Sequence, residues 1–190
     1  MNKYFLVFYI FSIMTACRAP EPREPVVKRS DQFLKESVVR NRALQEKEEK
    51  EIRKIIDKDS SHNYYTSSNG FWYKYEKQIP SEKHTPEFGD LVSFTYDIYS
   101  IEGEQIYSEE EIGRREYIMD KEKLFTGMRQ GLKLMKSGVK VTFYFPSSVA
   151  FGYYGDHEEI GRNMPIRATV TLDTIVPDSI NKTNNHKNNN

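Results

Sequence analysis

The sequence has a single cysteine, Cys17, and no excess of either charge, because its 28 basic residues balance 28 acidic ones. A lone cysteine excludes an internal disulfide. Zero net charge lacks the basic excess that is typical of nucleic-acid-binding proteins, so we expect no nucleic acid as a partner. The chain also has no catalytic-triad pattern, phosphate-binding loop or metal-ligand spacing. We therefore expect no metal, no other cofactor, and no acid–base or nucleophilic catalytic residue.

Long apolar runs are scarce, and the one that stands out lies at the N-terminus. Residues 4–14 form an apolar run that follows Lys3, is too short to span a bilayer comfortably, and leads into Thr15-Ala16-Cys17. This pattern resembles a bacterial lipoprotein signal, with residues 1–16 removed and Cys17 lipidated. The resemblance implies a lipid anchor in a membrane of the cell envelope, with the rest of the chain facing the periplasm. An ordinary secretory signal with an incidental cysteine is the alternative.

The segments on either side of the central region are polar. Residues 17–29 alternate prolines with charges, which predicts an extended tether behind the lipidated cysteine. Residues 30–58 predict a helix that Ser30 caps and whose middle is almost wholly charged. We interpret this charged helix as a solvated spacer whose ends pack locally, or alternatively as a helix that dimerises or binds a partner. Residues 178–190 are rich in Asn and Lys and predict a disordered tail.

The central region carries three connected patterns. Residues 124–136 place apolar side chains on one helical face, and Gly138 follows as a helix stop. Residues 139–146 alternate apolar side chains and end at Pro146, which predicts a strand. A glycine–aromatic loop at 150–156 then leads to a last strand at 169–176. Earlier strands are expected at 71–76, 91–99 and from 105.

The order of these patterns resembles the FKBP-type peptidyl-prolyl cis-trans isomerase domain over residues 71–177. The resemblance implies an α+β fold, in which a twisted antiparallel sheet of about five strands wraps around one short helix. A substrate pocket is then expected between the helix and the sheet. The positions that match the family's pocket are Tyr96, Ile106, Tyr107, Leu124, Phe125, Met128, Phe151, Met164 and Leu172.

Three of these positions depart from the family pattern. Tyr107 stands where a carboxylate is expected, Phe151 lacks the usual tyrosine hydroxyl, and Met128 replaces the tryptophan of the pocket floor. Loss of one hydrogen bond to a ligand costs about 0.5–1.5 kcal/mol. The substitutions keep the pocket apolar, so we expect it to accept proline-containing polypeptides.

Two hypotheses follow for function. The first is a membrane-anchored prolyl isomerase that assists folding or assembly of envelope proteins. The second is a non-catalytic chaperone or binding module that uses the same apolar pocket, and the departures at Tyr107 and Phe151 keep it open. The layout of signal, charged helix and one domain is also similar to that of the gliding-motility-associated isomerase lipoproteins of Bacteroidetes.

Overall fold

The computed structural model describes residues 27–80 and 84–180, with side chains from residue 33 onward. The chain divides into two compact units, Met1–Arg40 and Asn41–Asn190. The described part of the first unit is the beginning of helix α2 (Val27–Lys58), where Phe33, Leu34, Val38 and Val39 are exposed. The predicted signal peptide, Cys17 and most of the tether lie outside the described residues. The helix begins at Val27, three residues before the predicted Ser30.

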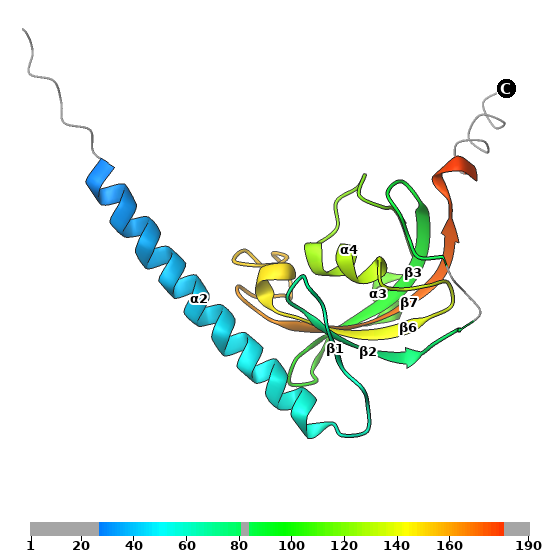
Figure 1. Cartoon of the computed structure of the whole chain (residues 1–190), viewed down its shortest axis with the longest axis horizontal. Helices are drawn as coiled ribbons and strands as arrows, with labels where there is room; N and C mark the ends of the chain where they lie inside the picture. Colours follow the sequence, from blue (N-terminus) through cyan, green and yellow to red (C-terminus); the bar gives the residue numbers. More distant parts are fainter. Residues whose placement is uncertain (1–26, 81–83, 181–190) are drawn as a thin grey trace, which may run out of the picture. The chain divides into compact units, whose positions relative to one another are not determined.

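The second unit is built on one antiparallel sheet of seven strands (Figure 1). These are β1 (Tyr65–Thr66), β2 (Trp72–Lys77), β3 (Leu91–Ser100), β4 (Gln105–Tyr107), β5 (Arg115–Ile118), β6 (Lys140–Phe145) and β7 (Ile166–Val176). The spatial order is β1-β2-β6-β7-β3-β4, and β5 pairs with the beginning of β3. This confirms the expected α+β class with a twisted antiparallel sheet.

One face of the sheet holds the main core. Alternation along β6 turns Phe143 and Phe145 to this face, where their rings stack 5.3 Å apart. Helix α4 (Thr126–Leu132) covers them (Figure 1) and buries Met128 and Leu132 completely. The close approach depends on Gly127, since a Cβ there would lie 2.6 Å from the Phe145 ring.

Helix α4 is shorter than the predicted 124–136. Beyond Leu132 the backbone continues in tighter turns, with Met135 N–H donating to the Leu132 carbonyl, and these turns still bring Met135 into the core. Gly138 does not end the helix. It has φ of +76° and donates to the Leu172 carbonyl, so it turns the chain into β6.

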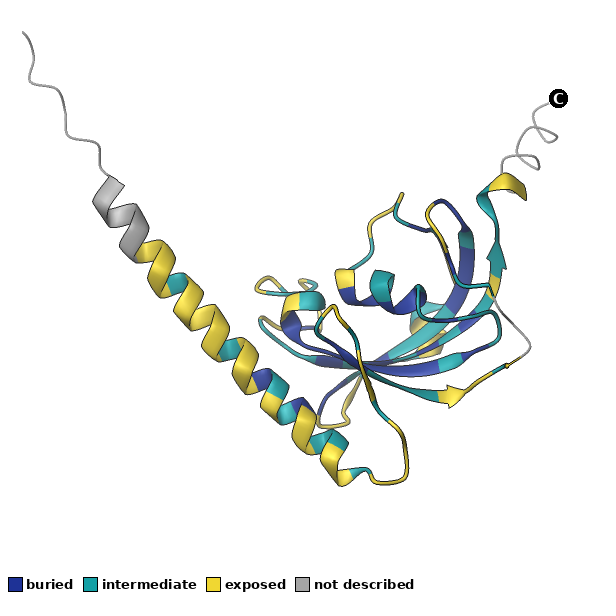
Figure 2. Ribbon diagram, in the orientation of Figure 1, coloured by how far each residue is buried: buried dark blue, intermediate teal, exposed yellow. Residues whose placement is uncertain are grey.

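The opposite face of the sheet is covered by the second half of α2. Trp72 and Tyr144, which alternate with core-facing neighbours on β2 and β6, pack there with Ile52 and Ile101. Figure 2 shows buried positions in this half of the helix, and Ile52 is 0% exposed. The compact unit therefore begins at Asn41, whereas the sequence placed the start of the domain at residue 71.

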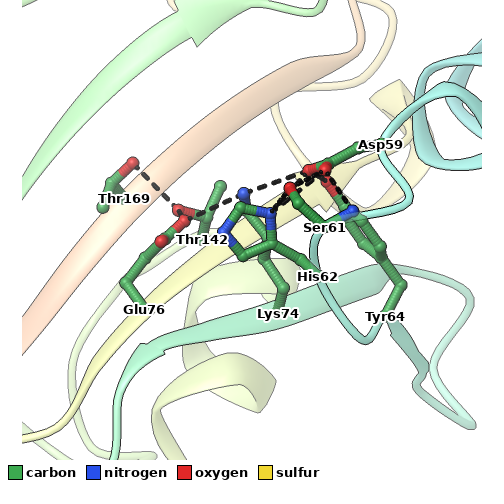
Figure 3. A network of polar contacts seen from close by, with 8 residues as sticks. All are labelled: Asp59, Ser61, His62, Tyr64, Lys74, Glu76, Thr142 and Thr169. Atoms are coloured by element: carbon green, nitrogen blue, oxygen red, sulfur yellow. Dashed lines mark hydrogen bonds and ion pairs between the residues drawn. The ribbon is translucent and has the colours of Figure 1, made fainter.

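A polar network fixes the chain where α2 ends (Figure 3). Asp59 accepts hydrogen bonds from the Ser61 and Tyr64 hydroxyls and contacts His62. These contacts, the Ser61 bond first, hold the pKa of Asp59 well below its usual range. Lys74 on β2 bridges Asp59 and Glu76 at 3.4 and 3.3 Å, so the network connects the end of α2 to the sheet.

Three short elements and one terminus differ from the sequence expectations. Helix α3 (Glu109–Ile112) and strand β5 follow β4, and a 3-10 turn, η1 (Ser147–Val149), follows β6. Asp178 donates its N–H to Asp90 and pairs with Lys121 at 3.2 Å, so ordered structure extends past residue 177. No helix in the described ranges 27–80 and 84–180 has the length and apolar character to cross a bilayer.

Candidate functional site

An open cleft of about 600 Å³ lies beside the second half of β3. Its walls come from β3, β4, α3, β5 and the loop that follows η1. The lining residues are Tyr96, Ile98, Tyr107, Glu111, Ile112, Arg115, Phe151, Asp156 and Glu158. Three of the nine predicted pocket residues therefore line this cleft: Tyr96, Tyr107 and Phe151.

Phe125 stands behind the aromatic wall of the cleft. Its ring centroid lies 4.9 Å from that of Phe151 and 5.5 Å from that of Phe145. The wall is thus continuous with the main core. Because each ring restrains the next, Phe151 presents a fixed apolar surface to the cleft.

The other predicted pocket residues take different places. Met128 and Leu172 are 0% exposed and belong to the core, while Ile106 and Leu124 are half-buried against it. Met164 also packs on the core, but it lines a separate cleft of about 320 Å³ between α2 and the loop before β7. The nine residues therefore divide into three that line the cleft, five that support the core and its wall, and Met164 at the second cleft.

A carboxylate is present in the cleft, although the sequence analysis expected Tyr107 to remove it. The Tyr107 hydroxyl donates to Asp156 Oδ2 at 2.6 Å, and the amides of Glu158 and Ile160 donate to Asp156 Oδ1 at 2.9 Å. The charge missing at position 107 thus comes from a loop 49 residues later. This contact ties β4 to the loop that carries Phe151.

The two partners shift each other's pKa in opposite directions. The hydrogen bond to Asp156, followed by burial, raises the pKa of Tyr107 to about 12. Partial burial opposes ionisation of Asp156, but the hydrogen bonds from Tyr107 and the two amides outweigh it and hold the Asp156 pKa below its ordinary value. The pair is therefore a neutral phenol beside a carboxylate throughout the neutral range.

Charged side chains that the sequence analysis did not assign complete the rim. Glu111 accepts from the Ser108 backbone N–H and hydroxyl, and these bonds lower the pKa of Glu111. Ser108 caps α3 in return, and this S-x-x-E capping box was a readable signal in the sequence. Burial raises the pKa of Tyr96, and the positive charge of Arg115 opposes that shift.

The cleft combines apolar contact surface with a small number of oriented polar groups. Nothing among the described residues forms a group of three or more potential metal ligands. The cleft offers aromatic and aliphatic walls, a fixed phenol–carboxylate pair and one basic rim residue. Such a site can hold an extended peptide by apolar contact and by a few oriented hydrogen bonds.

Part of this chain is similar to known proteins. The family model described as FKBP-type peptidyl-prolyl cis-trans isomerase matches residues 82–174. A curated protein from Neisseria meningitidis serogroup B, the probable FKBP-type peptidyl-prolyl cis-trans isomerase FkpA, is 28% identical over 107 residues. That match covers 56% of this chain and 38% of the relative, so the similarity spans little more than a third of the relative's length.

Two solved structures share the fold. FkpA from Escherichia coli superposes with a TM-score of 0.57 at 22% identity, covering 94% of this chain and 84% of that chain. A peptidyl-prolyl cis-trans isomerase from Pseudomonas syringae pv. tomato superposes with a TM-score of 0.54 at 18% identity, covering 70% of this chain and 96% of that chain. At these identities the likeness establishes the fold alone.

Proposed function

We propose that this chain catalyses cis–trans isomerisation of X-Pro bonds, because its residues 82–174 match the family model described as FKBP-type peptidyl-prolyl cis-trans isomerase. Its substrates are proline-containing polypeptides, and the site is the cleft lined by Tyr96, Tyr107 and Phe151. The observation that carries this proposal is the rigid aromatic wall, in which Phe125 holds Phe151 at the cleft surface.

The physical chemistry of the reaction fits such a wall. Amide resonance holds the X-Pro bond planar with a barrier of about 18–20 kcal/mol. In the twisted transition state the resonance and much of the charge separation are lost, so an apolar surface favours that state over the well-solvated planar amide. No nucleophile or general base is required. The phenol–carboxylate pair at Tyr107 supplies a fixed polar edge that can orient the substrate backbone.

One observation favours a second candidate, a binding module with little turnover. The Tyr107 hydroxyl donates its hydrogen to Asp156, and Phe151 has no hydroxyl. The cleft therefore offers few free donors for the carbonyl groups that flank a substrate proline. A protein of this kind still holds proline-containing segments and keeps them from aggregating.

We also propose, from the sequence, where the protein is located in the cell and on which proteins it acts. Lipidation of Cys17 anchors the protein to a membrane of the cell envelope, with the domain facing the periplasm and acting on envelope proteins. The similar layout of gliding-motility-associated lipoproteins makes components of that machinery a client class. The exposed apolar residues of α2, such as Phe33 and Val38, support a dimer through this helix as a further proposal.

A direct assay separates the two candidates. Isomerisation of Leu-Pro and Glu-Pro tetrapeptides is followed at low temperature, where uncatalysed exchange takes more than about 10–100 s. An isomerase accelerates exchange of the Leu-Pro peptide more strongly. Binding of the peptide without acceleration identifies the binding module instead. His157→Asn is a matched control, because His157 is exposed in the same loop at φ of +71° and asparagine tolerates that backbone.

A further inference from the structure

A buried carboxylate connects α2 to the domain. Glu48 is 3% exposed, and its two oxygens accept hydrogen bonds from Ser147, one from the backbone N–H at 2.8 Å and one from the hydroxyl at 2.7 Å. The contact joins residues 99 positions apart. Ser147 lies within the span that the family model matches, but Glu48 lies outside it.

Ser147 in turn fixes the backbone on both sides of Phe151. Its carbonyl accepts the N–H of Ala150 at 3.1 Å and the N–H of Gly152 at 2.8 Å. These two residues flank Phe151 directly. A shift of Ser147 therefore moves the peptide units that set the position of the Phe151 ring in the cleft.

A carboxylate at position 48 is not needed to pack α2 against the sheet. Leu44 and Ile52 lie one turn before and after it on the same helical face, so an apolar residue at 48 would continue a packed stripe. Burying a carboxylate costs desolvation free energy, and replacing buried charges by apolar groups is often stabilising. An apolar side chain, however, would leave the Ser147 N–H and hydroxyl without the hydrogen bonds that Glu48 makes to them.

We propose that Glu48 is a positioning residue, and that the Glu48–Ser147 contact is a latch through which α2 holds Phe151 in its working position. The proposal rests on the function proposed for the cleft. It makes α2 part of the working site although no residue of α2 lines the cleft. A domain cut at residue 71 would keep every lining residue and lose the latch.

The test compares Glu48→Ala and Glu48→Gln in the full chain. Glutamine keeps an acceptor for the Ser147 N–H and meets the hydroxyl with its amide group, so it preserves both contacts. Glu46→Ala is the matched control, because Glu46 is exposed on the same helix and pairs with Arg42. All variants are assayed well below their unfolding temperatures. Trp72, the only tryptophan, lies under Arg53 at 5.3 Å, and its fluorescence reports whether α2 stays docked.

The latch predicts a specific set of results. Glu48→Ala lowers kcat/KM for the Leu-Pro peptide about tenfold and speeds hydrogen exchange at the amides of Ala150 and Gly152. Glu48→Gln and Glu46→Ala stay close to wild type in both measurements. If Glu48 only stabilises the fold, Glu48→Ala lowers the unfolding temperature but keeps wild-type kcat/KM and exchange at these amides, and the proposal is overturned.

Failure of the proposed function is a separate outcome. If the wild-type protein does not accelerate isomerisation, the assignment as an enzyme is wrong. The latch proposal is then tested by hydrogen exchange at the same amides and by affinity for the same peptide. Faster exchange with weaker binding in Glu48→Ala then supports the latch. Unchanged exchange and affinity contradict it.

Discussion

Phe151 links the aromatic core to the cleft, and its position depends on neighbours in both directions. On the core side its ring packs on Phe125, and in the loop its flanking amides are held by Ser147. Loss of either support would let water reach this apolar surface. Under the proposed function, Phe151 therefore acts through its placement and its apolar area, without a hydroxyl.

Replacing the supporting ring should be more damaging than replacing an exposed one. Phe125→Ala opens a space between Phe151 and Phe145, so we expect kcat/KM for a Leu-Pro peptide to fall at least about tenfold. Phe88→Ala is the control, because Phe88 is 67% exposed and does not line the cleft. Equal activity of the two variants would show that the wall takes no part in turnover.

The Tyr107–Asp156 pair determines how the site responds to pH. The folded pKa of Asp156 lies below its ordinary value of 3.8, so the pair's contribution to stability is present above about pH 4 and is lost as pH falls through that lowered pKa. The pKa of Tyr107 is raised from 10.0 to about 12, so its contribution to stability is full below pH 10 and is lost as pH rises through 12. We therefore expect the contribution of the pair to the free energy of unfolding to stay constant from about pH 5 to pH 9.

Tyr107→Phe removes the hydroxyl and keeps the ring. The difference in free energy of unfolding between wild type and this variant, measured by urea titration, should be constant from about pH 5 to pH 9 and shrink below pH 4 and above pH 11. The activity of the wild type should be flat over the same central range. A bell-shaped profile centred near neutrality would reveal a titrating group that the cleft residues do not account for.

At the scale of elements, the second half of α2 behaves as part of the domain. It covers the face of the sheet that carries Trp72 and Tyr144, and Glu48 accepts a hydrogen bond from Ser147 of η1. The interpretation as a solvated spacer whose ends pack locally agrees with the buried Ile52 near one end of the helix. It does not agree with the exposed Phe33 near the other end, nor with the buried Glu48 in the charged middle. Without this half-helix, the Trp72 face would lie open to water.

Truncating Ile52 tests how strongly the helix contributes. Because Ile52 is fully buried, Ile52→Ala should lower the free energy of unfolding by about 2–4 kcal/mol and the unfolding temperature by roughly 5–15 °C. Val38→Ala is the control, since Val38 is 66% exposed on the same helix. Thermal unfolding followed by Trp72 fluorescence and circular dichroism measures both variants. Similar unfolding temperatures would mean that the sheet is stable without the helix.

For the molecule as a whole, local patterns predicted what local physics determines. The alternation of β6 and the apolar face of α4 were readable because each repeats with the period of its own element, and the glycine–aromatic loop was readable from its composition. Contacts between segments that are distant in the sequence could not be predicted in this way. The charged middle of α2 gave no sign that Glu48 meets Ser147, and nothing near Tyr107 indicated that Asp156 would supply its carboxylate.

The least periodic elements were missed for a related reason. In β5 only Tyr117 is buried, and its exposed neighbours Arg115 and Glu116 resemble a charged loop. Helix α3 is four residues long and almost wholly acidic, so no apolar period marks it, although its capping box could have identified it. Two of the four charged residues that line the cleft, Glu111 and Arg115, come from these two elements, so the predicted pocket was more apolar than the observed one.

The whole chain also carries a prediction about its location. The run at residues 4–14 that leads to Thr15-Ala16-Cys17 predicts that Cys17 bears acyl chains, and multiple chains at about 0.8 kcal/mol per buried methylene give stable membrane attachment. Wild-type protein should therefore sediment with membranes, while Cys17→Ser should move to the soluble or unprocessed fraction. Mass spectrometry of the mature N-terminus should show cleavage before Cys17 and the added lipid mass.

Ser12→Ala, a substitution within the same leader that keeps the cysteine, is the control and should fractionate like wild type. Identical distribution of wild type and Cys17→Ser, together with an unmodified cysteine, would favour an ordinary secretory signal and remove the anchor from the proposed function.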